Sequence, residues 1–163
     1  MRVQIPFIKF AAALALMTLM SLSSCITDPP EEERVISVGE PVPEFTVTLG
    51  NGEEWSSRDS GGRTSVIIFF NTGCDDCRRE LPGLEEEYRE KGDRMRFVCI
   101  AREEDASDIA AWWRDNGLTM PWSAQSDRRI YGMFANTGIP RIFIVGPDSR
   151  IAASFGPGQN FEF

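Results

Sequence analysis

Hydrophobic and polar positions follow two different periods along the chain. Residues 66–70 and 95–101 are mostly apolar runs, which is typical of strands covered on both faces. Residues 78–91 and 107–116 instead repeat apolar side chains at helical spacing, and each segment is followed by a glycine. We therefore expect two buried strands, each followed by a helix, with Ser107 capping the second helix.

Shorter patterned segments flank these elements. Strands are expected at 45–49, 53–57, 142–145 and 151–155, in two pairs separated by turn-forming residues. Asn51-Gly52 joins the first pair, and Asn-Gly between alternating runs is a strong hairpin signal. A shorter helix is expected over 127–135. The order of elements predicts an α/β domain with a mixed central sheet flanked by helices and ending in an antiparallel hairpin.

The N-terminal segment differs from the rest of the chain. Residues 10–22 form an apolar stretch that follows two basic residues and is too short to span a bilayer, as in a signal peptide. Residues 22–25 (LSSC) resemble the bacterial lipobox, in which the cysteine is lipidated and becomes the first mature residue. We therefore expect a lipoprotein signal peptide over 1–24 and lipidation of Cys25. A plain signal-peptidase site is the alternative.

Residues 25–37 are expected to form a solvated tether, because they contain two prolines, three consecutive glutamates and little to bury. The remaining segment, 38–163, is long enough for one domain. The whole chain has a formal net charge of −8, which argues against nucleic acid or an anionic lipid surface as a partner. We expect a cell-envelope protein held at a membrane by its lipid, and Ile26 after the cysteine favours the outer membrane.

Two cysteines, Cys74 and Cys77, lie between the strand at 66–70 and the helix at 78–91. A CxxC at a strand-to-helix junction is typical of a redox pair. A thiol at a helix N-terminus faces unpaired backbone N–H groups and the positive end of the helix dipole, which favour the thiolate. We therefore predict that Cys74 is the nucleophile and Cys77 the resolving thiol of a redox-active disulfide.

A metal site and a structural disulfide are the alternatives for this pair. Zinc or copper needs about four ligands, yet the chain has no histidine and only two other cysteines, Cys25 and Cys99. A disulfide closing so short a loop would constrain the unfolded chain little. We expect no metal and no cofactor beyond the Cys74–Cys77 disulfide. Cys99, inside a predicted strand, is expected to be an inert core thiol.

Several short motifs accompany the cysteine pair: Pro43-Glu44-Phe45 ahead of Asn51-Gly52, Phe69-Phe70-Asn71-Thr72-Gly73-Cys74, Cys77-Arg78-Arg79-Glu80-Leu81-Pro82, Tyr131-Gly132 and Gly138-Ile139-Pro140. Through these motifs, over about residues 38–155, the chain resembles the extracytoplasmic thioredoxin-like proteins of the TlpA/ResA type. The resemblance implies a thioredoxin-like fold with an added N-terminal β-hairpin. It also implies that Cys74 is exposed and Cys77 shielded.

The resemblance further assigns roles to residues around the pair. Pro140 is expected in a cis peptide beside the cysteines, where the backbone of Ile139 would meet an extended substrate segment; a trans proline is the alternative. Gly73, which stands where the family commonly has tryptophan, joins these two residues in the expected substrate-binding set. Glu80 matches the family's CxxCxxExP pattern and is expected to exchange protons with the thiols. The alternative for Glu80 is a solvated helix-face carboxylate.

The family fold ends with a helix that residues 156–163 are too short and too rich in glycine and proline to supply, so we expect this C-terminal helix to be missing. The resemblance implies a lipid-anchored thiol:disulfide oxidoreductase that reduces disulfides of extracytoplasmic proteins. A membrane or extracytoplasmic electron donor would then reduce the enzyme.

Two other functions stay open. A peroxiredoxin-type peroxidase shares the fold, but its active-site pattern would place proline and threonine where this chain has Ile67 and Asn71. A non-catalytic thioredoxin-like interaction module would suit the acidic pair Asp75-Asp76 and the missing tryptophan.

Overall fold

The structure is a computed structural model that describes residues 32–161. The chain divides into two units, Met1–Glu32 and Glu33–Phe163, and the second contains all the helices and strands of the described residues. The predicted signal peptide and the predicted lipidation site at Cys25 lie outside the described residues. Within residues 32–161, no helix combines the length and the apolar character needed to cross a membrane.

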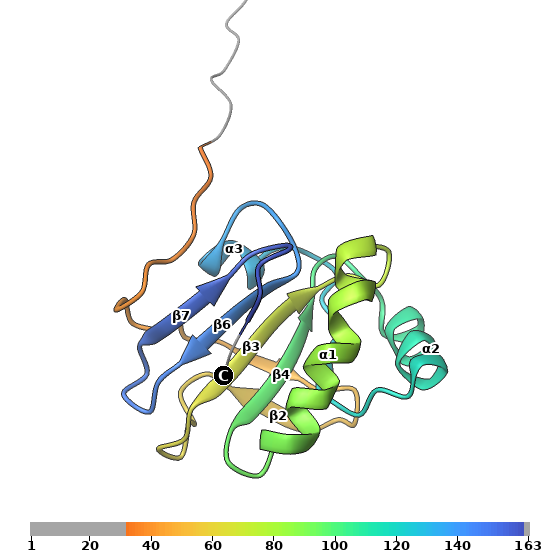
Figure 1. Ribbon diagram of the computed structural model, residues 1–163, viewed down its shortest axis with the longest axis horizontal. Coiled ribbons are helices and arrows are strands. Elements are labelled where there is room, and N and C mark those ends of the chain that lie inside the picture. Colours follow the sequence, from red (N-terminus) through yellow and green to blue (C-terminus); the bar gives the residue numbers. More distant parts are fainter. Residues whose placement is uncertain (1–31, 162–163) are drawn as a thin grey trace, which may run out of the picture. The chain divides into compact units, whose positions relative to one another are not determined.

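A five-stranded mixed sheet forms the centre of the compact unit (Figure 1). Its strands, in spatial order, are β5 (Trp122–Ser123), β4 (Arg96–Ala101), β3 (Ser65–Phe70), β6 (Arg141–Val145) and β7 (Ile151–Phe155). β3, β4 and β5 run parallel, whereas β6 is antiparallel to β3 and β7 is antiparallel to β6. Every residue of β3 is buried, which confirms the strand covered on both faces.

Helix α1 (Asp75–Lys91) crosses one face of the sheet, and the hairpin of β1 (Thr46–Thr48) and β2 (Glu54–Ser56) lies behind the other face (Figure 1). Aromatic side chains join the hairpin to the domain. The ring of Phe45 stacks on Trp55 and meets the edge of Phe134, which in turn packs on rings of the central sheet. The expected N-terminal hairpin is therefore confirmed as part of the core.

Several elements differ from the sequence prediction at their ends. α1 begins at Asp75, three residues earlier than expected, because Cys74 occupies its N-cap position. Helix α2 (Ala106–Asn116) has Asp105 rather than Ser107 at its N-cap, and no side chain caps it there. Helix α3 (Tyr131–Phe134) is much shorter than the predicted 127–135.

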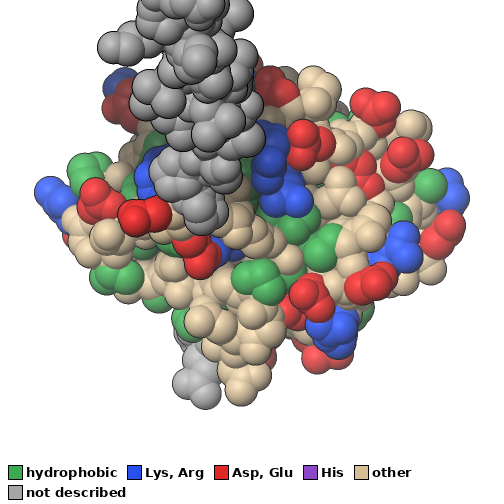
Figure 2. Space-filling view, turned by 90° about the horizontal axis from the view of Figure 1, so that it is seen from above, with side chains coloured by type: hydrophobic (Ala, Val, Ile, Leu, Met, Phe, Trp, Pro, Cys, Tyr) green, Lys and Arg blue, Asp and Glu red, His purple; other side chains and the backbone are tan. Residues whose placement is uncertain are grey.

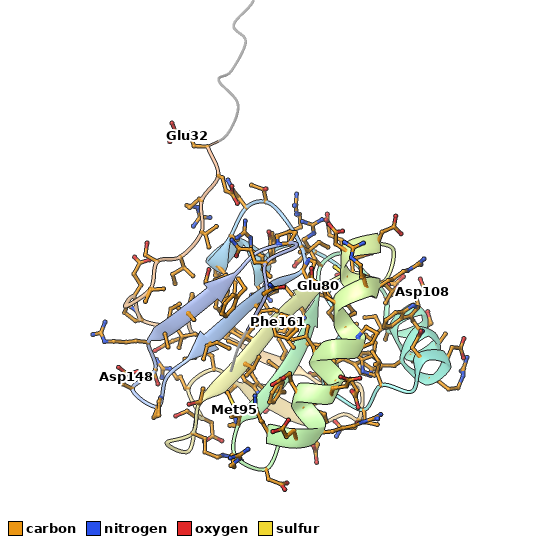
Figure 3. The ribbon with its side chains drawn as sticks, in the orientation of Figure 1. Glu32, Glu80, Met95, Asp108, Asp148 and Phe161 are labelled. Carbon is orange, nitrogen blue, oxygen red and sulfur yellow. The ribbon has the colours of Figure 1, made fainter. Side chains whose placement is uncertain are left out.

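The segment after β7 contains no helix within the described residues, as predicted. Instead, residues 156–159 form a turn, and Phe161 packs against the hydrophobic core. Figure 3 shows Phe161 beside α1, on the same face of the sheet as that helix. This short segment therefore covers part of that face.

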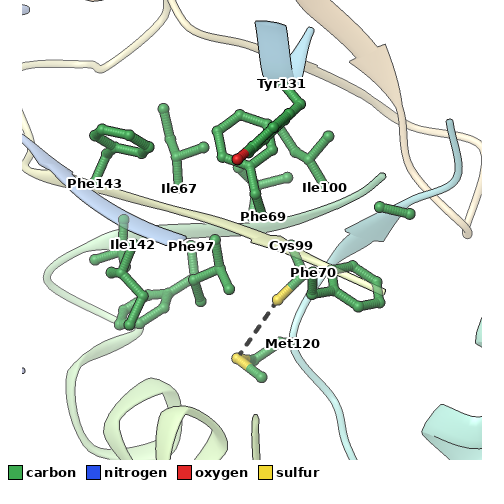
Figure 4. Close-up of a cluster of buried hydrophobic side chains, with 14 of the residues drawn as sticks. Ile67, Phe69, Phe70, Phe97, Cys99, Ile100, Met120, Tyr131, Ile142 and Phe143 are labelled. Carbon is green, nitrogen blue, oxygen red and sulfur yellow. Dashed lines mark hydrogen bonds between the residues drawn. The ribbon is translucent and has the colours of Figure 1, made fainter. Parts of the chain in front are cut away.

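Cys99 lies in the buried cluster drawn in Figure 4, in the middle of β4. Its thiol is 3.8 Å from the sulfur of Met120 and has no exposed surface. Burial raises the pKa of the Cys99 thiol well above its ordinary value. Its surroundings are those of the inert core thiol that the sequence predicted.

Candidate active site

Cys74 and Cys77 occupy the first turn of α1 in different surroundings. Cys74 is half-buried at the N-cap with extended backbone, and its sulfur accepts the N–H of Cys77 at 3.3 Å. Cys77 is completely buried, and both residues are free thiols. The Cys74 sulfur is thus accessible to a partner, whereas the Cys77 sulfur is shielded from solvent.

The surroundings of Cys77 favour its protonated form. Burial raises the pKa of the Cys77 thiol most, and the hydrogen bond with Cys74 raises it further. The charge of Glu80 acts in the same direction. Cys77 therefore needs a proton acceptor before it can attack another sulfur.

The loop before β6 brings a backbone carbonyl to the exposed thiol. The Ile139–Pro140 peptide bond is cis, as predicted, and the Cys74 thiol donates to the carbonyl oxygen of Ile139 at 3.5 Å. The hydroxyl of Tyr131 donates to the Gly138 carbonyl at 2.7 Å. The guanidinium of Arg141, which is 7 % exposed, donates to the Thr137 carbonyl at 2.9 Å. These two bonds hold the backbone immediately before Ile139.

A second loop, residues 71–73, leads from β3 into the helix. The side chain of Asn71 donates to the Arg102 carbonyl at 3.0 Å and accepts the N–H of Gly73 at 2.8 Å. A Cβ atom on Gly73 would lie 3.0 Å from this Asn71 oxygen, so glycine leaves room for the bond. Gly73 itself is exposed, and no aromatic ring from that position covers the sulfur.

Sequence reasoning missed Glu104, which holds the same loop from the other side. Its carboxylate accepts the backbone N–H of Thr72 at 2.9 Å and also the Thr72 hydroxyl. Glu104 lies 32 residues away in the sequence, and no local motif marks it. Only the parallel pairing of β3 with β4 brings the two loops together.

An open groove of about 530 Å³ lies beside the loop of residues 71–73, which leads to Cys74. Its wall is strongly acidic, with Arg78 as a basic neighbour. The acidic residues that line it are Glu103, Glu104, Asp105 and Asp108. Figure 2, which views the domain from above, shows many carboxylates on the side of α2, with basic side chains among them. The groove beside the loop that leads to Cys74 is therefore predominantly negative.

Glu80 is half-buried and turned toward the protein. Its Oε1 atom accepts the backbone N–H of Gly158 at 3.0 Å. Its Oε2 atom is buried and has no hydrogen-bond partner within the described residues. Glu80 thus lies against the C-terminal segment, on the same side of α1 as Phe161 (Figure 3).

The described residues contain no group of three histidine, cysteine, aspartate or glutamate side chains arranged to hold a metal ion.

Comparison with known proteins places these features in a family. The chain is 26% identical over 125 residues to the thiol-disulfide oxidoreductase ResA of Bacillus thuringiensis (strain Al Hakam), covering 74% of this chain and 70% of that protein. The ResA of Bacillus subtilis (strain 168) is 22% identical over 117 residues, which cover 71% of this chain and 65% of that protein. These relatives support the resemblance seen in the sequence motifs.

Solved structures share the fold. A candidate protein disulfide isomerase from Bacteroides thetaiotaomicron superposes with a TM-score of 0.73 at 23% identity, covering 77% of this chain and 82% of that one. A thiol:disulfide interchange protein of the thioredoxin family from Chlorobium tepidum TLS gives a TM-score of 0.65 at 23% identity, with coverages of 76% and 90%. The fold is therefore thioredoxin-like. Because residues 38–154 match the family model described as AhpC/TSA, the chain belongs to the AhpC/TSA family.

Proposed function

We propose that the protein is a thiol-disulfide oxidoreductase that reduces disulfides in extracytoplasmic proteins. The observation that carries this proposal is the contrast between its two thiols: Cys74 is accessible at the start of α1, and Cys77 is buried one turn further on. The similarity to proteins named thiol-disulfide oxidoreductase supports the same activity.

The first step uses Cys74. Its thiolate attacks one sulfur of a substrate disulfide, so a Cys74–substrate bond forms while the substrate S–S bond breaks and one substrate thiolate leaves. The N-terminus of α1 supports the thiolate with unpaired backbone N–H groups, including that of Cys77.

The second step uses Cys77. Its thiol loses a proton, and the resulting thiolate attacks the Cys74 sulfur, which breaks the mixed disulfide and releases the second substrate thiol. The substrate has then gained two electrons and the enzyme holds a Cys74–Cys77 disulfide. An extracytoplasmic or membrane electron donor returns the pair to the dithiol. In this proposal Glu80 accepts the proton of Cys77.

The loop around Ile139 suits an extended substrate segment. Its carbonyl lies 3.5 Å from the Cys74 sulfur, and Pro140 has no backbone N–H to leave unpaired there. Gly73 offers exposed backbone on the other side of the sulfur. We assign Ile139, Pro140 and Gly73 to substrate binding on these grounds.

Dithiothreitol-driven reduction of insulin tests the proposal. We expect Cys74→Ser to abolish the reaction, because it removes the attacking sulfur. Cys99→Ser is the matched control and should retain most of the activity, since Cys99 is buried away from the site. Cys77→Ser should accumulate a mixed disulfide on Cys74, which mass spectrometry would detect and which would identify substrates.

Two outcomes would favour the other functions. An inactive parent protein that still binds partners would support a non-catalytic interaction module. Peroxide consumption that is faster than disulfide reduction would support a peroxidase. Ile67 and Asn71 stand where the peroxidase pattern has proline and threonine, so neither position carries that pattern.

We also propose that Cys25 carries a lipid that anchors the domain in the cell envelope, with the outer membrane as the favoured site. The lipobox-like sequence before Cys25 supports this proposal. Contact with the membrane is then made through the lipid rather than through the acidic domain.

A further inference from the structure

The C-terminal segment connects two parts of the active site. In the turn at residues 156–159, the Gln159 N–H donates to the Gly156 carbonyl at 3.2 Å, and the Gly156 N–H donates to the Gln159 side chain at 2.7 Å. Pro157 packs on the loop before β6, since a Cβ on Gly138 would lie 3.4 Å from its ring. The turn therefore lies against the loop that carries Ile139.

The same turn reaches helix α1. The N–H of Gly158 donates to Oε1 of Glu80 at 3.0 Å. Within the described residues, this is the only hydrogen bond that the Glu80 carboxylate makes. Further along, Phe161 approaches α1 at Gly83, where a Cβ would lie 3.9 Å from the phenyl ring. The segment thus bridges the loop before β6 and the helix that carries both thiols.

Glu80 is placed unusually for a surface-helix carboxylate. One oxygen is held by Gly158, and the other is buried without a partner, an arrangement that costs free energy and therefore persists only because other contacts hold the side chain in place. Glu80 follows Cys77 by three residues on the same helix face and affects its titration. A carboxylate with an unpaired oxygen beside a buried thiol is suited to accept the proton of that thiol.

We propose that the turn at residues 156–159 is a positioning element for the exchange reaction, in which the Gly158 N–H holds Glu80 beside Cys77. This inference rests on the proposed function and assigns Gly158 to its second step. When Cys77 attacks the mixed disulfide, its proton passes to Glu80, the Cys74–Cys77 bond forms, and the bond between Cys74 and the substrate sulfur breaks so that the substrate thiolate leaves. Without the Gly158 bond, the Glu80 side chain is free to turn toward solvent, and the proton transfer slows.

Reaction with dithionitrobenzoate separates the two steps. Attack by Cys74 releases one coloured thiolate and leaves a mixed disulfide. Attack by Cys77 on Cys74 then releases a second coloured thiolate and forms the enzyme disulfide. The experiment uses the full chain carrying Cys25→Ser, purified in detergent. We expect its absorbance to rise in two phases, the first reporting Cys74 and the second reporting Cys77.

Gly158→Pro removes the N–H donor and is incompatible with the φ of +71° at this position. We expect the second phase to slow about tenfold, since positioned proton transfer contributes roughly 10² to 10⁴ in rate. The first phase should stay within about twofold, because Cys74 is not bonded to the turn. Gly158→Asn is the matched control: it keeps the N–H, tolerates positive φ, and meets no atom within 4 Å of its Cβ. The rate of its second phase should equal that of the parent protein.

Epistasis with Glu80 decides whether the turn acts through the carboxylate. Glu80→Gln should slow the second phase, and adding Gly158→Pro to it should cause no further loss. If Gly158→Pro slows the Glu80→Gln protein as much as it slows the wild type, or leaves the wild type unchanged, the proposal is wrong. A chain ending at Phe155 also lacks the Gly158 donor and provides a second test if Gly158→Pro fails to fold. Its second phase should be slowed in the same way, and an unchanged second phase would contradict the proposal. Absence of both phases in the parent protein would instead overturn the proposed function.

Discussion

Glu85 shows how this fold keeps a charged side chain inside. The side chain of this residue in α1 is 4% exposed, and it accepts hydrogen bonds from the Thr119 N–H and hydroxyl, from the Met120 N–H and from Arg89. Burial by itself raises the pKa of the carboxyl, but these bonds more than offset it, so the pKa lies below its ordinary value of 4.5. Glu85 thereby fastens α1 to the segment that precedes β5.

Glu85→Gln should lower the free energy of unfolding by about 2 kcal/mol, because an amide N–H group would face backbone donors. The depressed pKa also predicts a pH dependence. The carboxylate stabilises the fold fully above its unfolded pKa, and this contribution is lost as the pH falls through the lower folded pKa. Urea unfolding between about pH 6 and pH 3 should show a shallower loss for Glu85→Gln than for wild type. The exposed neighbour Glu86→Gln should behave as wild type, and identical curves for all three proteins would contradict the prediction.

The charges around the thiols predict a reducing pair. Asp75 is exposed beside Cys74, Asp76 is paired with Arg79, and Glu80 lies near Cys77. These carboxylates give a thiolate less electrostatic support than strongly oxidising members of the fold provide. Equilibration with glutathione and dithiothreitol buffers should yield a potential nearer about −270 mV than about −120 mV. Asp75→Asn should move it toward oxidising values, whereas a parent potential above about −180 mV would exclude a reductant.

Site residues were predictable from the sequence where their role is local. Cys74 and Cys77 stand in one helical turn, so spacing and residue type sufficed to single them out, whereas the cis peptide at Pro140 was expected from the resemblance to a family. Glu104 and Gly158 act through contacts that span 32 and 78 residues, and their own neighbours in sequence carry no signal. The chemistry of the pair could therefore be predicted, but the groups that orient it could not.

At the scale of elements, the hairpin of β1 and β2 is attached by a close contact. The Gly50 N–H donates to the Trp122 carbonyl at 2.8 Å, and a Cβ on Gly50 would lie 2.4 Å from the Trp122 ring. Ser123 adds a hydrogen bond to the Thr48 carbonyl at 2.7 Å. The hairpin thus packs closely against β5, with no space for a side chain at position 50.

Gly50→Ala should destabilise the protein by about 1 to 3 kcal/mol, since the ring or the hairpin must move. Thermal unfolding followed by tryptophan fluorescence measures the change. Gly132→Ala is the control, because no atom lies within 4 Å of its Cβ and its φ is not positive. It should change stability by less than about 1 kcal/mol. Equal effects at the two positions would show that the close contact does not matter.

The sequence pattern predicted the long elements better than the short ones. The apolar runs of β3 and β4 and the helical stripe of α1 extend over enough residues to show their period. β5 has two residues, too few for any period, and forms only because it pairs with Cys99 and Ile100. In the segment before α3, Asp127 accepts the N–H of Arg129 in a turn, which delays the helix to Tyr131.

At the scale of the whole molecule, we expect attachment to a membrane to depend on the sulfur atom of Cys25. If the Cys25 thiol carries the lipid, Cys25→Ser should shift the protein from the membrane to the soluble fraction or leave its precursor uncleaved. Fractionation and mass measurement in a producing bacterium would show either result. Cys99→Ser is the control and should fractionate as wild type. Unchanged cleavage and membrane association of Cys25→Ser would refute lipidation at this residue.

The pairing of β3 with β6 places Phe69 opposite Arg141 and so brings Cys74 to Ile139 across 65 residues. A chain still being synthesised contains both thiols of the CxxC long before β6 exists. Until β6 inserts beside β3, the thiols lack the carbonyl partner and the substrate loop, and they react as ordinary cysteines. Under the proposed function, we therefore expect full exchange activity only after β6 has joined the sheet, so that an unfinished chain does not act on its neighbours.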